Sequence, residues 1–179
     1  MAIKTEVLLD AAAAQLARRP NSTLAQIADA AGVSRTTLFY RFSTREQLID
    51  TLAVDTLEHL RTALLEIVWE NADLPSNLRR VTAALMPMAE RMQVVLREAP
   101  SHASPDMNDS WAYAIEPLSS YLRAQQSAGA LKKKLPITWL VESLIYLMFA
   151  AWDSVSTDVL DPKVAAELVG QTWLDGASS

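Results

Sequence analysis

The side chains with the most specific chemistry lie close together, between Ser34 and Arg45. This segment combines arginines with hydroxyl side chains and with the adjacent aromatic pair Phe39 and Tyr40. Arginine bonds guanine edges, threonine and phenylalanine contact the thymine methyl group, and hydroxyl groups reach phosphates. A surface of this kind on a short helix suits the major groove of a nucleic acid.

The charge of the chain is unevenly distributed. The 179 residues carry a net charge of −5, which by itself disfavours a nucleic-acid partner. Residues 18–45, however, contain a single acidic residue, Asp29, against five arginines, Arg18, Arg19, Arg35, Arg41 and Arg45. This segment is therefore locally basic on an otherwise acidic chain, and nucleic acid stays possible as a partner.

Two short helices are predicted to position these side chains. Thr23 and Gln26 have the spacing of a capping box for a helix over about 24–31. Gly32 breaks that helix at a position that favours φ > 0, and Ser34 caps a third helix ending near Arg41. The layout is that of a helix-turn-helix.

In the third predicted helix, Leu38 and Phe42 share a face with Val33 and can pack on the preceding helix. The opposite face carries Arg35, Thr36, Phe39 and Tyr40, flanked by Thr37 and Arg41. The alternative is an ordinary helical hairpin in which Phe39 and Tyr40 are buried.

Arg45 stands in the first turn of the next predicted helix, which a Ser43–Glu46 capping box opens. A cation there opposes the helix dipole, so its position favours an external anionic partner such as a phosphate. The hydroxyl of Thr23 offers a second phosphate contact.

The whole chain is predicted to be all-α, with about nine helices. Proline and glycine residues separate the periodic segments. We expect a helix-turn-helix DNA-binding domain at 1–45 and a helical regulatory and dimerisation domain at 46–179. The predicted segments are helices at about 3–18, 24–31, 34–41 and 44–71, one from Leu74 that breaks or kinks at Pro87, a loop at 99–105, a helix from there to Gly129 divided near Pro117, and helices at 137–156 and 162–174.

The segment TLAQIADAAGVSRTTLFYRFSTREQLI resembles the N-terminal signature of TetR-type transcriptional regulators, over about residues 3–50. The resemblance places Thr23, Arg35, Thr37, Tyr40 and Arg45 where family members contact phosphates or bases. Thr36, Phe39, Arg41 and Arg45 depart from a frequent Gly, Tyr, His and Lys. Together the residues predicted to bind DNA are Thr23, Ser34, Arg35, Thr36, Thr37, Phe39, Tyr40, Arg41 and Arg45.

Beyond residue 50 the resemblance implies a cavity for a small apolar or aromatic effector and a homodimer formed through the last two helices. The candidate effector contacts are Trp69, Met86, Met88, Met92, Trp111, Tyr113, Tyr121 and Trp152. A Met or aromatic stripe at helical spacing is, however, more often plain hydrophobic core. The nearly apolar helix at 137–156 favours burial against a partner subunit, and burial within one subunit is the alternative. The candidate interface residues are Trp139, Leu140, Leu144, Leu147, Met148, Leu168 and Trp173.

Enzymatic, metal and membrane functions find little support. The chain has no cysteine and two histidines, His59 and His102, in no metal-ligand spacing, and it has no nucleophile motif. We therefore expect neither a metal nor another cofactor. The apolar run at 139–152 is shorter than the roughly 20 residues of a membrane span and carries Glu142. We expect a soluble, cytoplasmic protein.

The favoured hypothesis is a dimeric TetR-type repressor that binds a palindromic double-stranded DNA operator and is released by a small-molecule effector. The alternative is a TetR-like protein-interaction module, or a ligand-independent DNA-binding protein without an inducer.

Overall fold

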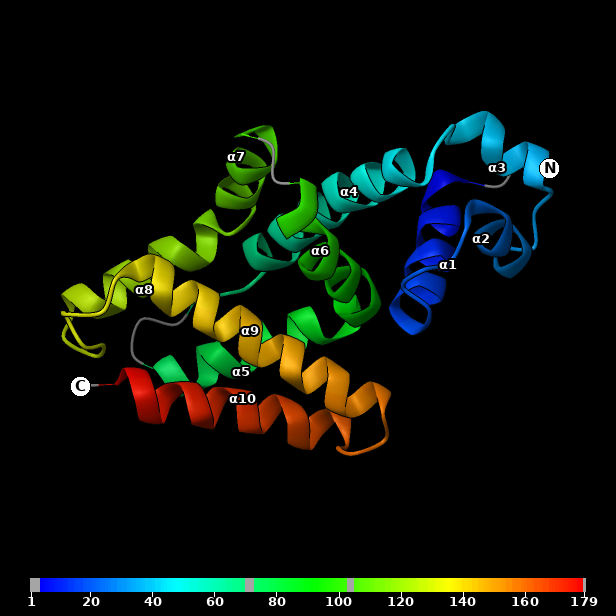
Figure 1. The fold of residues 1–179 in the computed structure, drawn as a ribbon. Helices are drawn as coiled ribbons and strands as arrows, with labels where there is room; N and C mark the ends of the chain where they lie inside the picture. Colours follow the sequence, from blue (N-terminus) through cyan, green and yellow to red (C-terminus); the bar gives the residue numbers. More distant parts are fainter. Residues whose placement is uncertain (1–3, 70–72, 103–104, 179) are drawn as a thin grey trace. The chain divides into compact units, whose positions relative to one another are not determined.

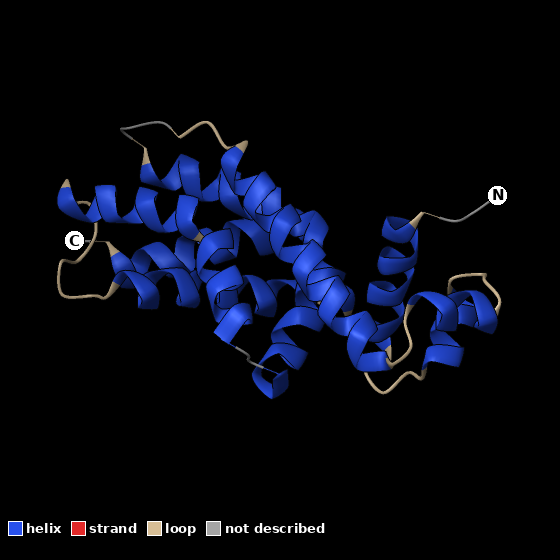
Figure 2. Cartoon of the chain, turned by 90° about the horizontal axis from the view of Figure 1, so that it is seen from above, coloured by secondary structure: helices blue, strands red, loops and turns tan. Residues whose placement is uncertain are grey.

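The computed structural model describes residues 4–69, 73–102 and 105–178, with the backbone alone at 99–102 and 105–107. Within these ranges the chain forms ten α-helices, close to the number expected, and one turn of 3₁₀-helix (Figures 1 and 2). The described residues contain no β-strand, and the all-α prediction is confirmed. The helices are α1 (Thr5–Arg18), α2 (Leu24–Ala30), α3 (Arg35–Arg41), α4 (Arg45–Leu65), α5 (Leu74–Leu85), η1 (Met86–Met88), α6 (Ala89–His102), α7 (Pro105–Ala114), α8 (Glu116–Ser127), α9 (Ile137–Ser156) and α10 (Pro162–Ala177).

Most predicted helix boundaries agree with the structure, and two differ. Helix α4 ends at Leu65 instead of near residue 71. Beyond its end the carbonyl oxygen of Val68 accepts a hydrogen bond from Nη1 of Arg80, so a side chain replaces the helical donor. The predicted loop at 99–105 was wrong over its first part, because α6 continues to His102. Tertiary packing of the buried first half of α6 stabilises the helix beyond what local propensity predicts.

The predicted break at Pro87 is confirmed as the turn η1. Proline lacks the amide hydrogen that a continuous helix would need at this position. The turn separates α5 from α6, so the two helices are distinct elements.

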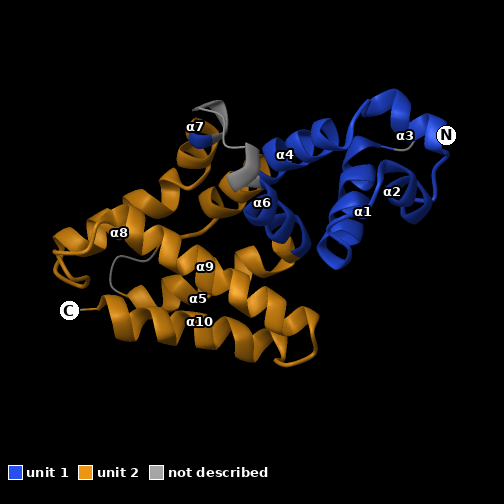
Figure 3. Ribbon diagram, in the orientation of Figure 1, with its two compact units in different colours: residues 1–57, 90–108 blue, residues 58–89, 109–179 orange. Residues whose placement is uncertain are grey.

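The chain divides into two compact units (Figure 3). Unit 1 comprises residues 1–57 and 90–108, and unit 2 comprises residues 58–89 and 109–179. Unit 1 thus adds the first part of α4 and most of α6 to the three N-terminal helices. The domain boundary at residue 45 stays a prediction.

Packing and side-chain hydrogen bonds between helices hold unit 2 together. Helix α10 packs along α9 and α5, and α8 packs on α9. The indole Nε1 of Trp173 donates to the carbonyl oxygen of Leu140 at 3.0 Å and to Oγ of Ser143 at 3.1 Å. The amide Nδ2 of Asn77 donates to the hydroxyl of Tyr121 at 2.7 Å. In the described part of the chain, no helix is both long and apolar enough to cross a membrane.

Candidate nucleic-acid interface

The turn between α2 and α3 has the predicted caps. Thr23 and Gln26 form the full capping box, with the Gln26 amide donating to Oγ1 of Thr23 and the Thr23 amide donating to Oε1 of Gln26. Gly32 has φ of +66°, which a residue with a Cβ adopts only with strain. Ser34 caps α3 by accepting a hydrogen bond from the Thr37 amide at 3.1 Å. These local bonds fix the direction in which α3 leaves the turn.

The inner face of α3 packs into the core of unit 1. Leu38 and Phe42 are buried together with Ile27 of α2, as their spacing predicted. Ala31 and Val33 pack against the same hydrophobic cluster. The face of α3 that carries Leu38 and Phe42 therefore anchors the helix in the core of unit 1.

The outer face of α3 is open to solvent. Tyr40 is 91% exposed and Phe39 is 47% exposed, so the alternative of a hairpin that buries both rings is wrong. Arg35 and Thr36 are exposed beside them. Arg35 lies 3.5 Å from Asp29, in a pair whose two side chains are each 65% exposed. An exposed pair of this kind contributes about 0–1 kcal/mol, which is too little to withhold Arg35 from a stronger anionic partner.

The residues that flank this face are engaged with the protein itself. The hydroxyls of Ser34 and Thr37 lie 2.8 Å apart in a hydrogen bond. Nη1 of Arg41 donates to Oγ1 of Thr5, in the first turn of α1, at 2.8 Å. Arg41 therefore also links α3 to α1.

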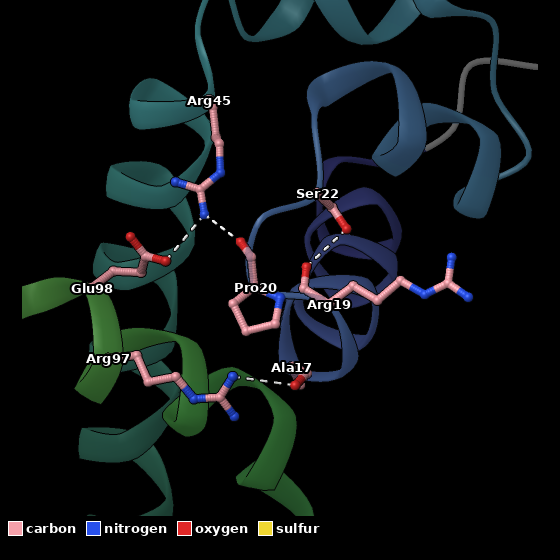
Figure 4. A network of polar contacts seen from close by, with 7 residues as sticks. All are labelled: Ala17, Arg19, Pro20, Ser22, Arg45, Arg97 and Glu98. Atoms are coloured by element: carbon pink, nitrogen blue, oxygen red, sulfur yellow. Dashed lines mark hydrogen bonds and ion pairs between the residues drawn. The ribbon is translucent and has the colours of Figure 1, made fainter.

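The structure corrects the reasoning about Arg45. Its helix is capped by Thr44, which accepts from the Gln47 amide, instead of by the predicted Ser43–Glu46 pair. Nη2 of Arg45 donates to the carbonyl oxygen of Pro20 at 2.6 Å and to Oε1 of Glu98 at 3.1 Å (Figure 4). The anionic partner that the position required lies within the protein, on α6.

Sequence reasoning missed the whole contribution of α6 to unit 1. Arg91 ion-pairs with Asp10 of α1 at 2.8 Å and with Asp55 of α4 at 2.5 Å. Burial opposes the charge, but the hydrogen bonds to Asp55 and Asp10 raise the pKa of Arg91 above its ordinary value. Nη1 of Arg97 donates to the carbonyl oxygen of Ala17 at 3.2 Å. These partners are 36 to 81 residues apart, and no local spacing marks them.

Comparison with known proteins agrees with this geometry. Residues 8–52 match the family model of bacterial regulatory proteins of the tetR family. The HTH-type transcriptional regulator NfxB of Pseudomonas aeruginosa is 26% identical over 180 residues, which cover 97% of this chain and 94% of NfxB. The chain carries a TetR-type N-terminal region at residues 8–52. The relatives that it resembles are transcription regulators.

Solved structures share the fold of this chain over nearly its whole length. The TetR-like regulator LfrR of Mycobacterium smegmatis, in complex with proflavine, matches with a TM-score of 0.78 and 23% identity, over 97% of this chain and 96% of LfrR. A TetR-family regulator of Marinobacter aquaeolei matches with a TM-score of 0.72 and 17% identity, over 97% and 95% of the two chains.

The residues predicted to contact an effector fall in both units. Met92 belongs to unit 1, and the other seven belong to unit 2. Tyr113 is 64% exposed, with the guanidinium of Arg61 3.8 Å above its ring, so it lines no enclosed cavity. Met86 and Trp111 are half-buried, and Met88 is buried.

Three of the candidate effector contacts, Trp69, Tyr121 and Trp152, are aromatic residues of unit 2 with well-defined surroundings. Trp69 stacks on Tyr121 with ring centroids 4.4 Å apart. Burial raises the pKa of Tyr121, although the hydrogen bond from Asn77 partly offsets this rise. Trp152 is 1% exposed, and among the described residues its indole nitrogen has no hydrogen-bond partner.

The predicted dimer-interface residues also separate into two groups. Leu140, Leu144, Met148 and Trp173 are buried within the subunit, so for these four the alternative of burial in one subunit is the correct one. Trp139 is 59% exposed and Leu168 44% exposed, and Leu147 is half-buried. Two shallow grooves, of about 140 and 180 Å³, lie on α9 and α10 and share Leu147 and Thr172.

Proposed function

We propose that this chain is a cytoplasmic homodimeric TetR-type repressor that binds a palindromic operator through α3 and is released by a small-molecule effector. The observation that carries the proposal is the division of α3 into two faces. Leu38 and Phe42 are buried, while Arg35, Thr36, Phe39 and Tyr40 face solvent. The exposed set contributes little to the packing of the subunit, and its chemistry suits base edges in a major groove.

The contacts of each side chain suggest which residues approach bases and which contact phosphates in the proposed complex. Arg35, Thr36, Phe39 and Tyr40 approach the bases. The hydroxyls of Thr23, Ser34 and Thr37 contact phosphates, which position the helix without reading sequence. Arg41 and Arg45 add positive charge at the two edges of this surface. Two copies of α3 in a dimer would read half-sites about 34–36 Å apart.

The experiment is an alanine substitution at Tyr40, tested on an operator selected from random-sequence duplex DNA with the wild-type protein. Tyr40 has little contact with its own subunit, so Tyr40→Ala should leave the thermal unfolding midpoint nearly unchanged. It should weaken operator binding by about 1–3 kcal/mol, as expected for loss of a base contact.

Leu38→Ala serves as the matched control on the same helix. Its side chain is fully buried, so it should destabilise the protein by about 2–5 kcal/mol and weaken DNA binding only through unfolding. Operator binding that is unchanged in both Tyr40→Ala and Arg35→Ala would refute the proposed role of α3.

The outer surface of α9 and α10 supports the proposed dimer. Trp139, Tyr146 and Leu168 expose large apolar side chains on these two helices. The two grooves between the helices could receive side chains of a second copy. A symmetric interface of this kind brings the same surface of each subunit together.

Trp152 supports the proposed effector. A buried N–H without an acceptor is unfavourable by about 1–3 kcal/mol, so a ligand that supplies an acceptor would bind with that advantage. LfrR, which shares the fold, binds the aromatic molecule proflavine. We therefore propose an aromatic effector with a hydrogen-bond acceptor that reaches the indole of Trp152.

A further inference from the structure

Arg45 and Glu98 form an ion pair within unit 1 that bears directly on DNA binding. The guanidinium Nη2 of Arg45 lies 3.1 Å from Oε1 of Glu98. The side chains of Arg45 and Glu98 are 26% and 20% exposed, so water screens the pair only in part. The same Nη2 donates to the carbonyl oxygen of Pro20, between α1 and α2 (Figure 4).

The Arg45–Glu98 pair uses the same interactions as a contact between an arginine and a phosphate. A carboxylate and a phosphate both accept hydrogen bonds from a guanidinium and both neutralise its charge. A DNA phosphate that contacted Arg45 would therefore compete with Glu98 for the same guanidinium. An arginine whose charge is already compensated releases fewer counterions from DNA and adds less to affinity.

We propose that Glu98 is a positioning residue that restrains operator binding, because its carboxylate competes with a DNA phosphate for Arg45. The inference rests on the proposed DNA-binding role of α3 and adds a residue on α6 that lowers affinity. When DNA binds, Arg45 shares its charge between the carboxylate and the phosphate. The carbonyl of Pro20 keeps the guanidinium between α1 and α4 in both states.

Glu98→Gln tests this competition with little change in shape. Glutamine retains the Oε1 acceptor and removes the negative charge. The probe is mixed-sequence duplex DNA, because a phosphate contact acts on every sequence. On a duplex of about 30 base pairs at about 50 mM salt, Glu98→Gln should bind about three- to tenfold more tightly. The plot of log K against log salt should steepen by up to about 0.9.

Glu90→Gln is the matched control. Glu90 is also on α6 and lies 3.5 Å from Arg18, in a pair with side chains 75% and 51% exposed. The control removes the same charge from the same helix, so a general gain in positive charge would act equally in both variants. We expect it to change affinity by less than about twofold.

A double variant, Arg45→Gln with Glu98→Gln, tests whether Glu98 acts through Arg45. In an Arg45→Gln background, Glu98→Gln should no longer tighten binding or steepen the salt dependence. Equal effects of Glu98→Gln and Glu90→Gln, weaker binding by Glu98→Gln, or an effect that persists without Arg45 would each overturn the inference. Thermal unfolding of Glu98→Gln and of a second variant, Glu98→Ala, shows whether a loss of binding comes from a destabilised fold. That result would assign Glu98 a purely structural role and would also overturn the inference.

Failure of this inference is distinguishable from failure of the proposed function. If Tyr40→Ala weakens operator binding and Glu98→Gln has no effect, α3 reads DNA and the competition at Arg45 is absent. If the wild-type protein binds no duplex even at low salt, the proposed function and the inference both fail.

Discussion

Arg91 provides the sharpest test of how unit 1 is held together. Its guanidinium joins three helices that are distant in sequence, with Asp10 on α1, Asp55 on α4 and Arg91 itself on α6. We predict that Arg91→Met destabilises unit 1 strongly, because methionine keeps the aliphatic stem and removes both ion pairs. The change also removes the cation that Asp10 and Asp55 share.

The magnitude follows from the exposure of each partner. The side chain of Arg91 is 11% exposed, that of Asp55 is 28% exposed and that of Asp10 is 60% exposed. A partly buried, charge-assisted pair such as the one with Asp55 contributes about 1.5–3 kcal/mol. The pair with Asp10 is nearer to a surface pair, at about 0–1 kcal/mol. Together the loss should be about 2–4 kcal/mol, or about 1–2 M in the urea midpoint.

The assay uses two probes that report on different parts of the chain. All five tryptophans lie in unit 2, so tryptophan fluorescence follows that unit, whereas far-UV circular dichroism follows helices in both. If the units unfold independently, Arg91→Met lowers only the dichroism transition. If they unfold together, both transitions shift equally. Protein concentration is kept constant, because dimer formation changes apparent stability.

Arg18→Met is the control for Arg91→Met. It removes an arginine from the same unit, and its partner Glu90 also lies on α6, but the pair is exposed and 3.5 Å long. We expect Arg18→Met to change stability by less than about 1 kcal/mol. A midpoint for Arg91→Met equal to that of Arg18→Met would refute the claim that burial makes the Arg91 pairs important.

Two further predictions concern unit 2. Leu168→Glu should convert the proposed dimer to monomers in sedimentation velocity without unfolding the subunit, because Leu168 is exposed in the monomer. Val68→Glu, at a residue that is 74% exposed, is the control, and a persistent Leu168→Glu dimer would exclude this interface. Trp173→Phe should destabilise the protein by about 1–1.5 kcal/mol more than Trp152→Phe, because Trp173 donates to Leu140 and Ser143 whereas the Trp152 N–H has no acceptor among the described residues; equal losses would contradict the unsatisfied state of Trp152.

Local sequence signals predicted much of the fold. The Thr23 capping box, the turn at Gly32 and the break at Pro87 all depend on residues within four positions of one another. Such features follow from backbone preferences and short hydrogen bonds, which one sequence contains. The exposed face of α3 was predictable for the same reason, since helical periodicity assigns Leu38 and Tyr40 to different sides.

Burial within the subunit was less predictable. An apolar helix such as α9 has the same sequence pattern whether its neighbours belong to its own chain or to another. Leu144 and Met148 are covered within the subunit, while Trp139 on the same helix is exposed. The extension of α6 through residues 99–102 was missed for a related reason, because tertiary packing outweighed local loop signals.

The sequence correctly predicted that Arg45 needs an anionic partner, but it could not predict which residue supplies it. A cation in the first turn of a helix is stabilised by a nearby anion, because it opposes the positive end of the helix dipole. Glu98 supplies that anion from 53 residues away, and nothing in the local pattern around either residue indicates the pairing. A DNA phosphate is also an anion and would satisfy the same requirement. Under our proposal the internal pair does not remove Arg45 from the DNA-binding surface. It makes the strength of the proposed phosphate contact depend on a residue of α6.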